Sequence, residues 1–289
     1  ERLVKAGYSL KVWNRTKSKA EPLAEKGATL VDSPADLAGV DVLCTMVSTG
    51  KDVEALYFGE LGVLTGDETP GIFIDFSSIG VDHSAQLREQ LSARGAQFLC
   101  SPVSGNGKCV KAGKLSSVVS GPQEVYDTVK YIIEAIAVNG VSYVGDGELA
   151  RFCKIAHNVM LGVVTQNLAE ITVLAEKAGV SRYAFLDFMN NSVMGSIFTR
   201  YKTNAFVNLD WTTTFTPALL RKDLDLGLAA GRELNVAMPV TAATREALQA
   251  HFGAASLQGD PEAYLEKDFA AMIETVGLAS GLTLESEDK

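Results

Sequence analysis

Short apolar segments alternate with helical segments in the first half of this chain, and this alternation constrains the fold more than any other feature. Segments of strand length and composition occupy residues 9–14, 29–31, 41–47, 71–76, 97–103, 115–120 and 140–144. Helical spacing of apolar residues occupies residues 16–26, 81–94 and 122–137. Strands and helices in this order predict an α/β domain with a doubly wound parallel sheet.

The pattern changes after Gly147. Residues 149–178 form one almost uniformly apolar stretch with helical spacing, and Ser181 is placed to cap the next helix. The segments at residues 217–233, 239–252 and 261–276 are also helical in period. We therefore predict two domains, a sheet domain over residues 1–147 and an all-helical domain over residues 148–289 that begins with a long buried helix. The acidic tail at residues 284–289 is expected to fray.

Composition excludes several classes of function. A net charge of −9 argues against nucleic acid and anionic membrane surfaces as partners. The four cysteines form no CxxC pair and the three histidines form no metal-binding cluster, so we expect free thiols in a reducing compartment and no metal. Uninterrupted apolar runs stay below about 18 residues and no signal peptide is visible, which predicts a cytoplasmic protein without a membrane span.

The turn at residues 14–17 ends the first predicted strand. In a Rossmann-type dinucleotide-binding unit this turn meets the adenosine ribose, where NAD enzymes place an acid and NADP enzymes place an arginine. Here Asn14 stands at the acid position and is followed by Arg15 and Thr16. Because a guanidinium matches a phosphate, the turn favours NADP, with NAD as the alternative. An ordinary polar turn capped by Thr16 explains the same residues.

The glycine-rich phosphate loop of such a unit, GxGxxG, is not in this chain. Residues 1–7 have the pattern of a helix end closed by glycine. We therefore expect the first strand of the sheet and the phosphate loop to precede Glu1.

A second candidate segment is the small-residue loop at residues 101–107, SPVSGNG, which follows a predicted strand. Backbone N–H groups in such a loop bind a carboxylate, and Ser104 adds a hydroxyl donor. A plain connection between a strand and a helix is the alternative.

Two charged or polar pairs lie on helical segments. Lys154 and Asn158 are four residues apart, so one face of the long helix carries both. A lysine on a buried helix is costly without a partner or task, and a desolvated lysine is a usable general acid or base. A lysine that extends along the helix edge to solvent is the alternative. Lys222-Asp223 interrupts another apolar helix, and without further context a solvated helix face is the preferred interpretation of this pair. His157 is interpreted as a packing residue.

These segments, in this order, resemble the β-hydroxyacid dehydrogenase family, which includes 3-hydroxyisobutyrate dehydrogenase and the semialdehyde reductases and belongs to the 6-phosphogluconate dehydrogenase superfamily. The resemblance runs from Leu3 to about Gly277. It rests on KAGYSLKVWNRT (residues 5–16), CTMVST (44–49), IDFSSI (74–79), SPVSG (101–105), KIAHN (154–158) and KDLDLGL (222–228).

The resemblance implies a role for each segment. Lys154 matches the family's catalytic lysine, which exchanges a proton with the substrate oxygen during hydride transfer, and Asn158 matches its substrate-positioning partner. The implied substrate carboxylate loop holds Ser104 and Gly105, followed by Asn106. The predicted cofactor-binding residues are Asn14, Arg15, Thr16, Val47, Ser48, Asp52, Ser78 and Lys222, the last with Asp223 beside it.

Two positions depart from the family pattern. Glu148-Leu149-Ala150 stands where the family has a GxG pair just before the lysine. Asn106 replaces the second glycine of the family's SGG loop, and we keep it among the predicted substrate-binding residues. Both departures bear on the identity of the substrate more than on the type of reaction.

The sequence therefore predicts an NADP(H)-dependent oxidoreductase that interconverts a small β-hydroxy acid and its semialdehyde or keto form. Lys154 is the predicted proton donor or acceptor, in a water-excluding cleft between the domains. Two alternatives are an imine reductase and a non-catalytic oligomeric binding module. Relatives of both kinds generally lack the lysine, so Lys154 argues against them. We expect a small carboxylate-bearing substrate and a homodimer or homotetramer built on the helical domain.

Overall fold

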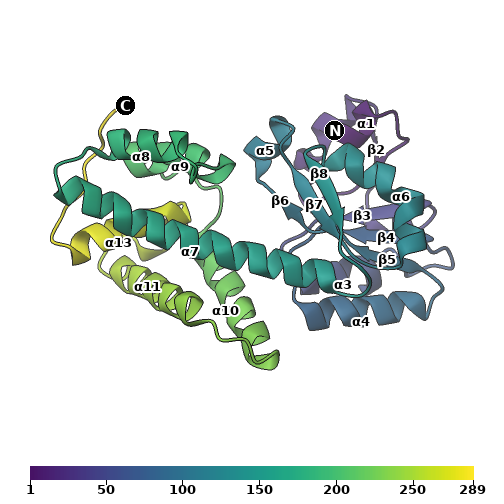
Figure 1. Ribbon diagram of the computed structural model, residues 1–289. Helices are drawn as coiled ribbons and strands as arrows, with labels where there is room; N and C mark the ends of the chain where they lie inside the picture. Colours follow the sequence, from purple (N-terminus) through teal and green to yellow (C-terminus); the bar gives the residue numbers. More distant parts are fainter. The chain divides into compact units, whose positions relative to one another are not determined.

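The computed structural model describes residues 1–289, and the chain divides into two compact units, Glu1–Lys154 and Ile155–Lys289 (Figure 1). The division falls inside helix α7 (Leu149–Lys177), whose first turn is hydrogen-bonded to the first unit through Ala150 and Arg151. The boundary predicted at 147/148 stands at the start of this helix, and as a division between functional domains it stays a prediction.

The first unit is built on short parallel strands. β1 (Lys11–Val12) pairs with β2 (Thr29–Leu30). A second parallel ladder runs in the order β3 (Val42–Thr45), β4 (Ile72–Asp75) and β5 (Gln97–Cys100). The α/β class with parallel sheets and the helical second half are confirmed.

The strands that follow differ from a purely parallel sheet. β6 (Val103–Ser104) pairs antiparallel with β7 (Ser116–Val119), which pairs parallel with β8 (Gly140–Tyr143). An antiparallel bridge between Cys100 and Ser120 joins β5 to this group. Only residues 105–115 separate β6 from β7, and a parallel connection needs a crossover of about a dozen residues or more. The short connection therefore reverses the strand direction.

Six helices accompany these strands: α1 (Arg2–Lys5), α2 (Glu21–Ala24), α3 (Gly50–Phe58), α4 (Val81–Ser92), α5 (Gly107–Lys111) and α6 (Gln123–Ile136). The helix predicted at residues 16–26 is reduced to a 3-10 turn at Lys17–Lys19 and to α2, because Pro22 has no N–H to continue a helix from the preceding turn. A further 3-10 turn covers Pro34–Leu37.

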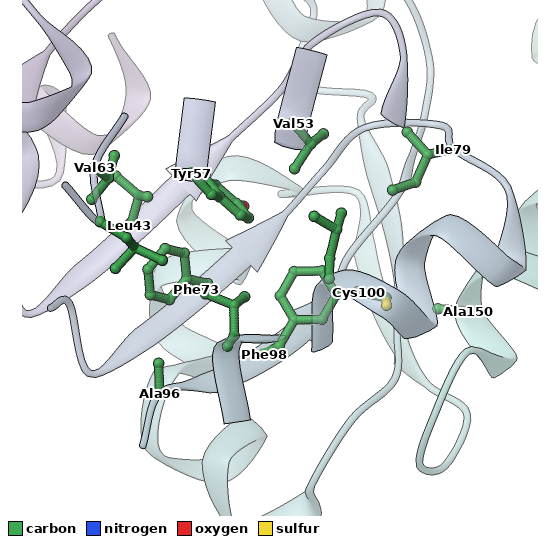
Figure 2. Close-up of a cluster of buried hydrophobic side chains, with 13 residues drawn as sticks. Leu43, Val53, Tyr57, Val63, Phe73, Ile79, Ala96, Phe98, Cys100 and Ala150 are labelled. Atoms are coloured by element: carbon green, nitrogen blue, oxygen red, sulfur yellow. The ribbon is translucent and has the colours of Figure 1, made fainter. Parts of the chain in front are cut away.

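Apolar side chains pack on both faces of the central strands. Successive residues of β4 and β5 alternate between two clusters, with Phe73 and Phe98 in one and Ile74 and Leu99 in the other. Figure 2 shows the first cluster, in which Tyr57 of α3 lies against the strands. Helix α6 packs in the second cluster. Burial on both faces is what near-continuous apolar strand segments require.

The second unit is all-helical, as predicted. After α7 come α8 (Arg182–Asn191), α9 (Ile197–Asn208), α10 (Pro217–Glu233), α11 (Pro239–Ala255), α12 (Pro261–Leu265), a 3-10 turn (Phe269–Ala271) and α13 (Met272–Ala279). Ser181 caps α8 as predicted, since its hydroxyl accepts the N–H of Ala184 at 3.2 Å.

The acidic tail is held in place, so the prediction that residues 284–289 fray is wrong. The two carboxylate oxygens of Glu287 accept the N–H groups of Arg182 and Tyr183 at 2.7 and 3.0 Å. These N–H groups belong to the first turn of α8, where a helix attracts negative charge. The buried Arg182 side chain also donates to the carbonyl of Glu285.

Helix α7 is long and apolar enough to cross a membrane by length and composition alone, and half of its most apolar window is buried inside the protein. One such helix is weak evidence for a span, because the core helix of a folded domain meets the same criteria. The sequence prediction counted only uninterrupted apolar runs, which Arg151 and Lys154 break.

All four cysteines are free thiols, as predicted. Burial raises the pKa of the Cys44 thiol to about 12, so this thiol stays protonated at neutral pH.

Candidate active site

A buried carboxylate lies at the carboxyl end of β4. Asp75 is fully buried, and its Oδ1 accepts hydrogen bonds from the hydroxyls of Thr45 at 2.8 Å and Ser77 at 2.7 Å. Its Oδ2 accepts from Nη2 of Arg151 at 2.6 Å. A buried charge is tolerated when it is paired and hydrogen-bonded in this way.

The same carboxylate connects two loops that carry predicted cofactor-binding residues. The hydroxyl of Ser77 accepts the backbone N–H of Val47 at 2.9 Å, which ties the loop after β3 to the turn after β4. Ser48 follows Val47 in the first loop and Ser78 follows Ser77 in the second. The structure therefore brings these predicted residues together at one edge of the sheet, where the carboxyl ends of parallel strands meet.

Asp52 lies in the first turn of α3 and takes part in a capping box with Thr49. Oδ2 of Asp52 accepts the N–H of Thr49 at 3.0 Å, and the N–H of Asp52 donates to the Thr49 hydroxyl at 3.2 Å. The other carboxylate oxygen lies 3.8 Å from Nη1 of Arg15. Two residues predicted to bind the cofactor from different loops are thus neighbours.

The turn after β1 presents Arg15 to solvent. The side-chain oxygen of Asn14 accepts the N–H of Thr16 at 2.9 Å and closes the turn. Thr16 occupies the N-cap position of the following 3-10 turn, but its hydroxyl makes no capping bond, so the predicted Thr16 cap is wrong. The Arg15 side chain is 85% exposed.

The predicted substrate loop requires glycine at position 105. Ser104 ends β6, and Gly105 has a φ of +128°, with a Cβ there lying only 2.8 Å from the Cβ of Cys109. The side-chain oxygen of Asn106 accepts the N–H groups of Lys108 and Cys109 at 3.0 and 3.2 Å. The residue that departs from the family loop is thus the N-cap of α5.

The start of α7 is built without the family's GxG pair. The hydroxyl of Ser120 accepts the N–H of Ala150 at 3.0 Å. The Glu148 carboxylate accepts a hydrogen bond from the Cys100 thiol at 3.1 Å and forms an ion pair with Arg88 of α4. The residues that replace the glycines are therefore bonded to neighbouring strands and helices.

Arg151 and Lys154 lie one turn apart at the start of α7. The Arg151 side chain is 1% exposed, and Lys154 is half-buried. Burial alone lowers the pKa of Arg151, but the neighbouring Cys100 and Asp75 outweigh it and raise the pKa, so Arg151 stays charged. Sequence analysis singled out Lys154 but missed Arg151 and Asp75. An arginine on the apolar helix one turn before the lysine was the available signal.

The second unit holds its own polar group. Asn158 is buried, and its Nδ2 donates to Oδ2 of Asp223 at 2.6 Å. Nζ of Lys222 lies 3.3 Å from Oδ1 of the same carboxylate. Asp223 therefore links two residues predicted for the site. A solvated helix face is the wrong interpretation for Asp223, which is buried, whereas the Lys222 side chain is partly exposed. His157, interpreted as a packing residue, is instead exposed, with Nδ1 2.9 Å from Oδ1 of Asn158.

Two glycines without side chains allow α7 and α10 to pack closely against each other. A Cβ on Gly227 would lie 2.2 Å from Cγ2 of Val159, and a Cβ on Gly162 would lie 2.9 Å from a leucine of α10. Gly162 follows Asn158 by one turn, and Gly227 follows Asp223 by one turn. The close contact therefore places the amide and the carboxylate within hydrogen-bonding distance.

Comparison with known protein families shows to which family the chain belongs. Residues 1–145 match the NAD binding domain of 6-phosphogluconate dehydrogenase, and residues 148–276 match the NAD-binding domain of NADP-dependent 3-hydroxyisobutyrate dehydrogenase. The chain belongs to the β-hydroxyacid dehydrogenase family. Members of this family are NAD(P)-dependent oxidoreductases, and NAD(P) is accordingly the cofactor of this chain.

Relatives of this chain carry different names. The uncharacterized oxidoreductase YfjR of Bacillus subtilis is 28% identical over 275 residues, which cover 95% of this chain and 93% of YfjR. The cytokine-like nuclear factor N-PAC of Xenopus tropicalis is 30% identical over 245 residues, which cover 84% of this chain and 46% of N-PAC. The chain thus spans less than half the length of N-PAC.

Solved structures share the fold over nearly the whole chain. A 3-hydroxyisobutyrate dehydrogenase from Mycobacterium tuberculosis, with L-serine, is 26% identical with a TM-score of 0.77, covering 95% of this chain and 93% of its own. The enzyme of that name from Salmonella typhimurium has a TM-score of 0.81 at 22% identity, over 94% and 93% of the two chains. An imine reductase from Pseudomonas sp. has a TM-score of 0.59 at 17% identity, over 95% and 93%. The last two likenesses show the fold alone.

The first unit fits a dinucleotide with a 2′-phosphate. Arg15 offers an exposed guanidinium at the carboxyl end of β1, and a planar fork of N–H donors suits a phosphate. Ser48 and Ser78 lie three residues beyond the ends of β3 and β4. This arrangement agrees with the cofactor class of the family.

Proposed function

We propose that this chain is an NADP(H)-dependent oxidoreductase that interconverts a small β-hydroxy acid and its semialdehyde or keto form. The observation that carries the proposal is Lys154, a half-buried lysine on an apolar helix, one turn after the fully buried Arg151. When bound, the cofactor supplies or accepts the hydride at its nicotinamide ring. We place the enzyme in the cytoplasm, as a homodimer or homotetramer formed through the helical unit.

The chain's own residues divide the remaining work. In the reducing direction, Nζ of Lys154 donates a proton to the substrate oxygen, and in the oxidising direction it accepts that proton. The hydroxyl of Ser104 and the backbone beside Gly105 bind the substrate carboxylate, which orients the reacting carbon. The Asn158 amide interacts with the substrate oxygen or the ammonium, and its orientation is set by its hydrogen bond to Asp223.

Preference for NADP over NAD rests on Arg15. Its guanidinium meets the 2′-phosphate, and Asn14 keeps the turn closed through its hydrogen bond to Thr16. Asp52 is assigned to the loop over the cofactor, and Lys222 stays a predicted cofactor-binding residue on the resemblance alone.

Helical-unit assembly is supported by large apolar side chains on its surface. Leu174 is 69% exposed, Phe188 is 68% exposed and Met194 is 68% exposed. Where such side chains are contiguous, they form the kind of surface that an interface between subunits buries.

Two other functions have a specific observation behind them. Imine reduction is favoured by the shared fold of the Pseudomonas imine reductase. A non-catalytic role is favoured by relatives named cytokine-like nuclear factor. The presence of Lys154 argues against both. Turnover of cyclic imines but not of semialdehydes would select the first, and absence of any NADPH oxidation would select the second.

The decisive experiment replaces Lys154 by alanine in an enzyme assayed on a panel of semialdehydes and hydroxy acids with both cofactors. We expect kcat to fall about 10²- to 10⁴-fold, the usual contribution of a general acid or base, while NADPH binding is retained. Lys177→Ala is the matched control, because Lys177 lies at the far end of the same helix, where its amine donates to the carbonyl of Ser280. Turnover of Lys154→Ala within a few-fold of the wild type would exclude the mechanism.

A further inference from the structure

We propose that the buried pair of Arg151 and Asp75 positions Lys154, by locking the first turn of α7 to the loops predicted to bind the cofactor. The inference rests on the proposed function of Lys154. It assigns no chemistry to Arg151 itself, which acts through the lysine one turn further along the helix.

The Arg151 side chain is fixed by three groups of the first unit. Nη2 donates to Asp75 at 2.6 Å, Nη1 donates to the carbonyl of Ser77 at 2.5 Å, and Nε donates to the hydroxyl of Ser84 at 3.1 Å. Because the guanidinium is planar and donates to three acceptors that lie in different directions, the three hydrogen bonds together allow it only one orientation. The helix position that carries it is therefore fixed in both rotation and height.

Lys154 follows on the same helix face. Residues three apart on a helix are neighbours, so any rotation or shift of the first turn moves Lys154 with Arg151. Misplacement of a reacting group by about 1 Å costs on the order of 10²-fold in rate. The fixed start of α7 thus sets the position of the lysine amine.

The same network reaches the predicted cofactor loops. The backbone N–H of Val47 donates to the Ser77 hydroxyl, which donates to Asp75, which accepts from Arg151. One buried carboxylate thereby joins the end of β3, the end of β4 and the start of α7. The lysine that exchanges the proton and the loops assigned to the cofactor share one rigid anchor.

A contribution to folding stability does not by itself explain why a charged pair is buried at this position. A buried ion pair often stabilises a protein no more than well-packed apolar residues of similar volume would. Apolar contacts are not directional, whereas the hydrogen bonds of an ion pair are. This chain also lacks the family's GxG pair, which would define the start of the helix. The ion pair supplies that definition at Arg151, next to the substituted residues 148–150.

The test measures Arg151→Gln in two ways in the full-length protein. The first is steady-state kinetics, where we expect kcat to fall at least about 10-fold. The Kd of NADPH should stay within about 3-fold, since Asp75 still accepts from Ser77 and keeps the loop at Val47 in place. The second is competitive acetylation by acetic anhydride, read by mass spectrometry. We expect Lys154 to be modified at least about 3-fold faster relative to Lys177, because the loosened turn exposes its amine.

The matched control is Arg182→Gln, which removes an equally buried arginine fork in the second unit. It should leave the kcat of the folded fraction and the Lys154 labelling ratio unchanged. If Arg151→Gln does not fold, the double variant Asp75→Asn/Arg151→Gln keeps hydrogen-bonding groups without an unpaired charge, and the same two effects are expected.

Unchanged kcat with unchanged labelling overturns the inference, and so does a fall in kcat without any change in labelling. If labelling responds as expected but the wild type oxidises or reduces no substrate of the panel, the positioning stands and the proposed function fails. Turnover retained by Lys154→Ala leads to the same conclusion about the function.

Discussion

Replacing Gly227 by alanine tests whether backbone contact between α7 and α10 builds the Asn158–Asp223 pair. Alanine in place of glycine inside a helix contributes about 1 kcal/mol through helix propensity. Against this, the new Cβ would lie 2.2 Å from Cγ2 of Val159, whereas real Cβ atoms essentially never approach another heavy atom closer than 3.0 Å. Overpacking of this kind costs about 1–3 kcal/mol. We expect the steric effect to win, with a net loss of about 1 kcal/mol in the free energy of unfolding.

The assay is urea unfolding of the second unit followed by the fluorescence of Trp211. A Trp13→Phe background removes the signal from the first unit. Gly253→Ala is the matched control, because a Cβ at this helical position meets nothing within 4 Å. It should raise the free energy of unfolding by up to about 1 kcal/mol.

A second substitution identifies the partner of the clash. Adding Val159→Ala to Gly227→Ala removes the atom that the new Cβ meets, so the double variant should be more stable than the sum of the single changes. The steric reasoning fails if Gly227→Ala is as stable as the wild type, or if the two substitutions are simply additive.

Two further predictions concern pH and cofactor choice. Burial, with a smaller contribution from Lys267, lowers the pKa of His251 from 6.5 to about 4. Between these two pH values His251 is protonated in the unfolded chain and neutral in the folded chain. With respect to His251, the protein therefore has its full stability above pH 6.5 and loses about 3 kcal/mol in the free energy of unfolding as the pH falls toward 4. Urea midpoints measured against pH should fall more steeply for the wild type than for His251→Gln. Arg15→Ala should raise the Kd of NADPH about 10- to 100-fold with little change for NADH, whereas Lys26→Ala should change neither. Equal losses for both cofactors would remove the argument for NADP.

Local sequence pattern was sufficient for most of the architecture, although not for the antiparallel pairing of β6 with β7. The alternation of apolar and helical segments predicts parallel strands covered on both faces, and β3, β4 and β5 form such a ladder. The cap at Ser181 and the all-helical second unit were also predictable. These features depend on residue periodicity and on hydrogen bonds within one turn, which neighbouring residues in the chain encode.

The composition of the candidate site was predictable only in pieces. Lys154 and Asn158 stand out because a polar face on an apolar helix is costly. The resemblance added the loops at Val47, Ser78 and Ser104. Nothing local marks which distant group each one meets.

Tertiary structure decided the partners. Arg151 and Asp75 are 76 residues apart in the chain, and Asn158 and Asp223 are 65 apart. A hydrogen bond or an ion pair depends on a few tenths of an ångström between segments, whereas periodicity reports only which side of an element is buried. The sequence by itself therefore determined which faces are inside, and folding determined which buried charges meet there.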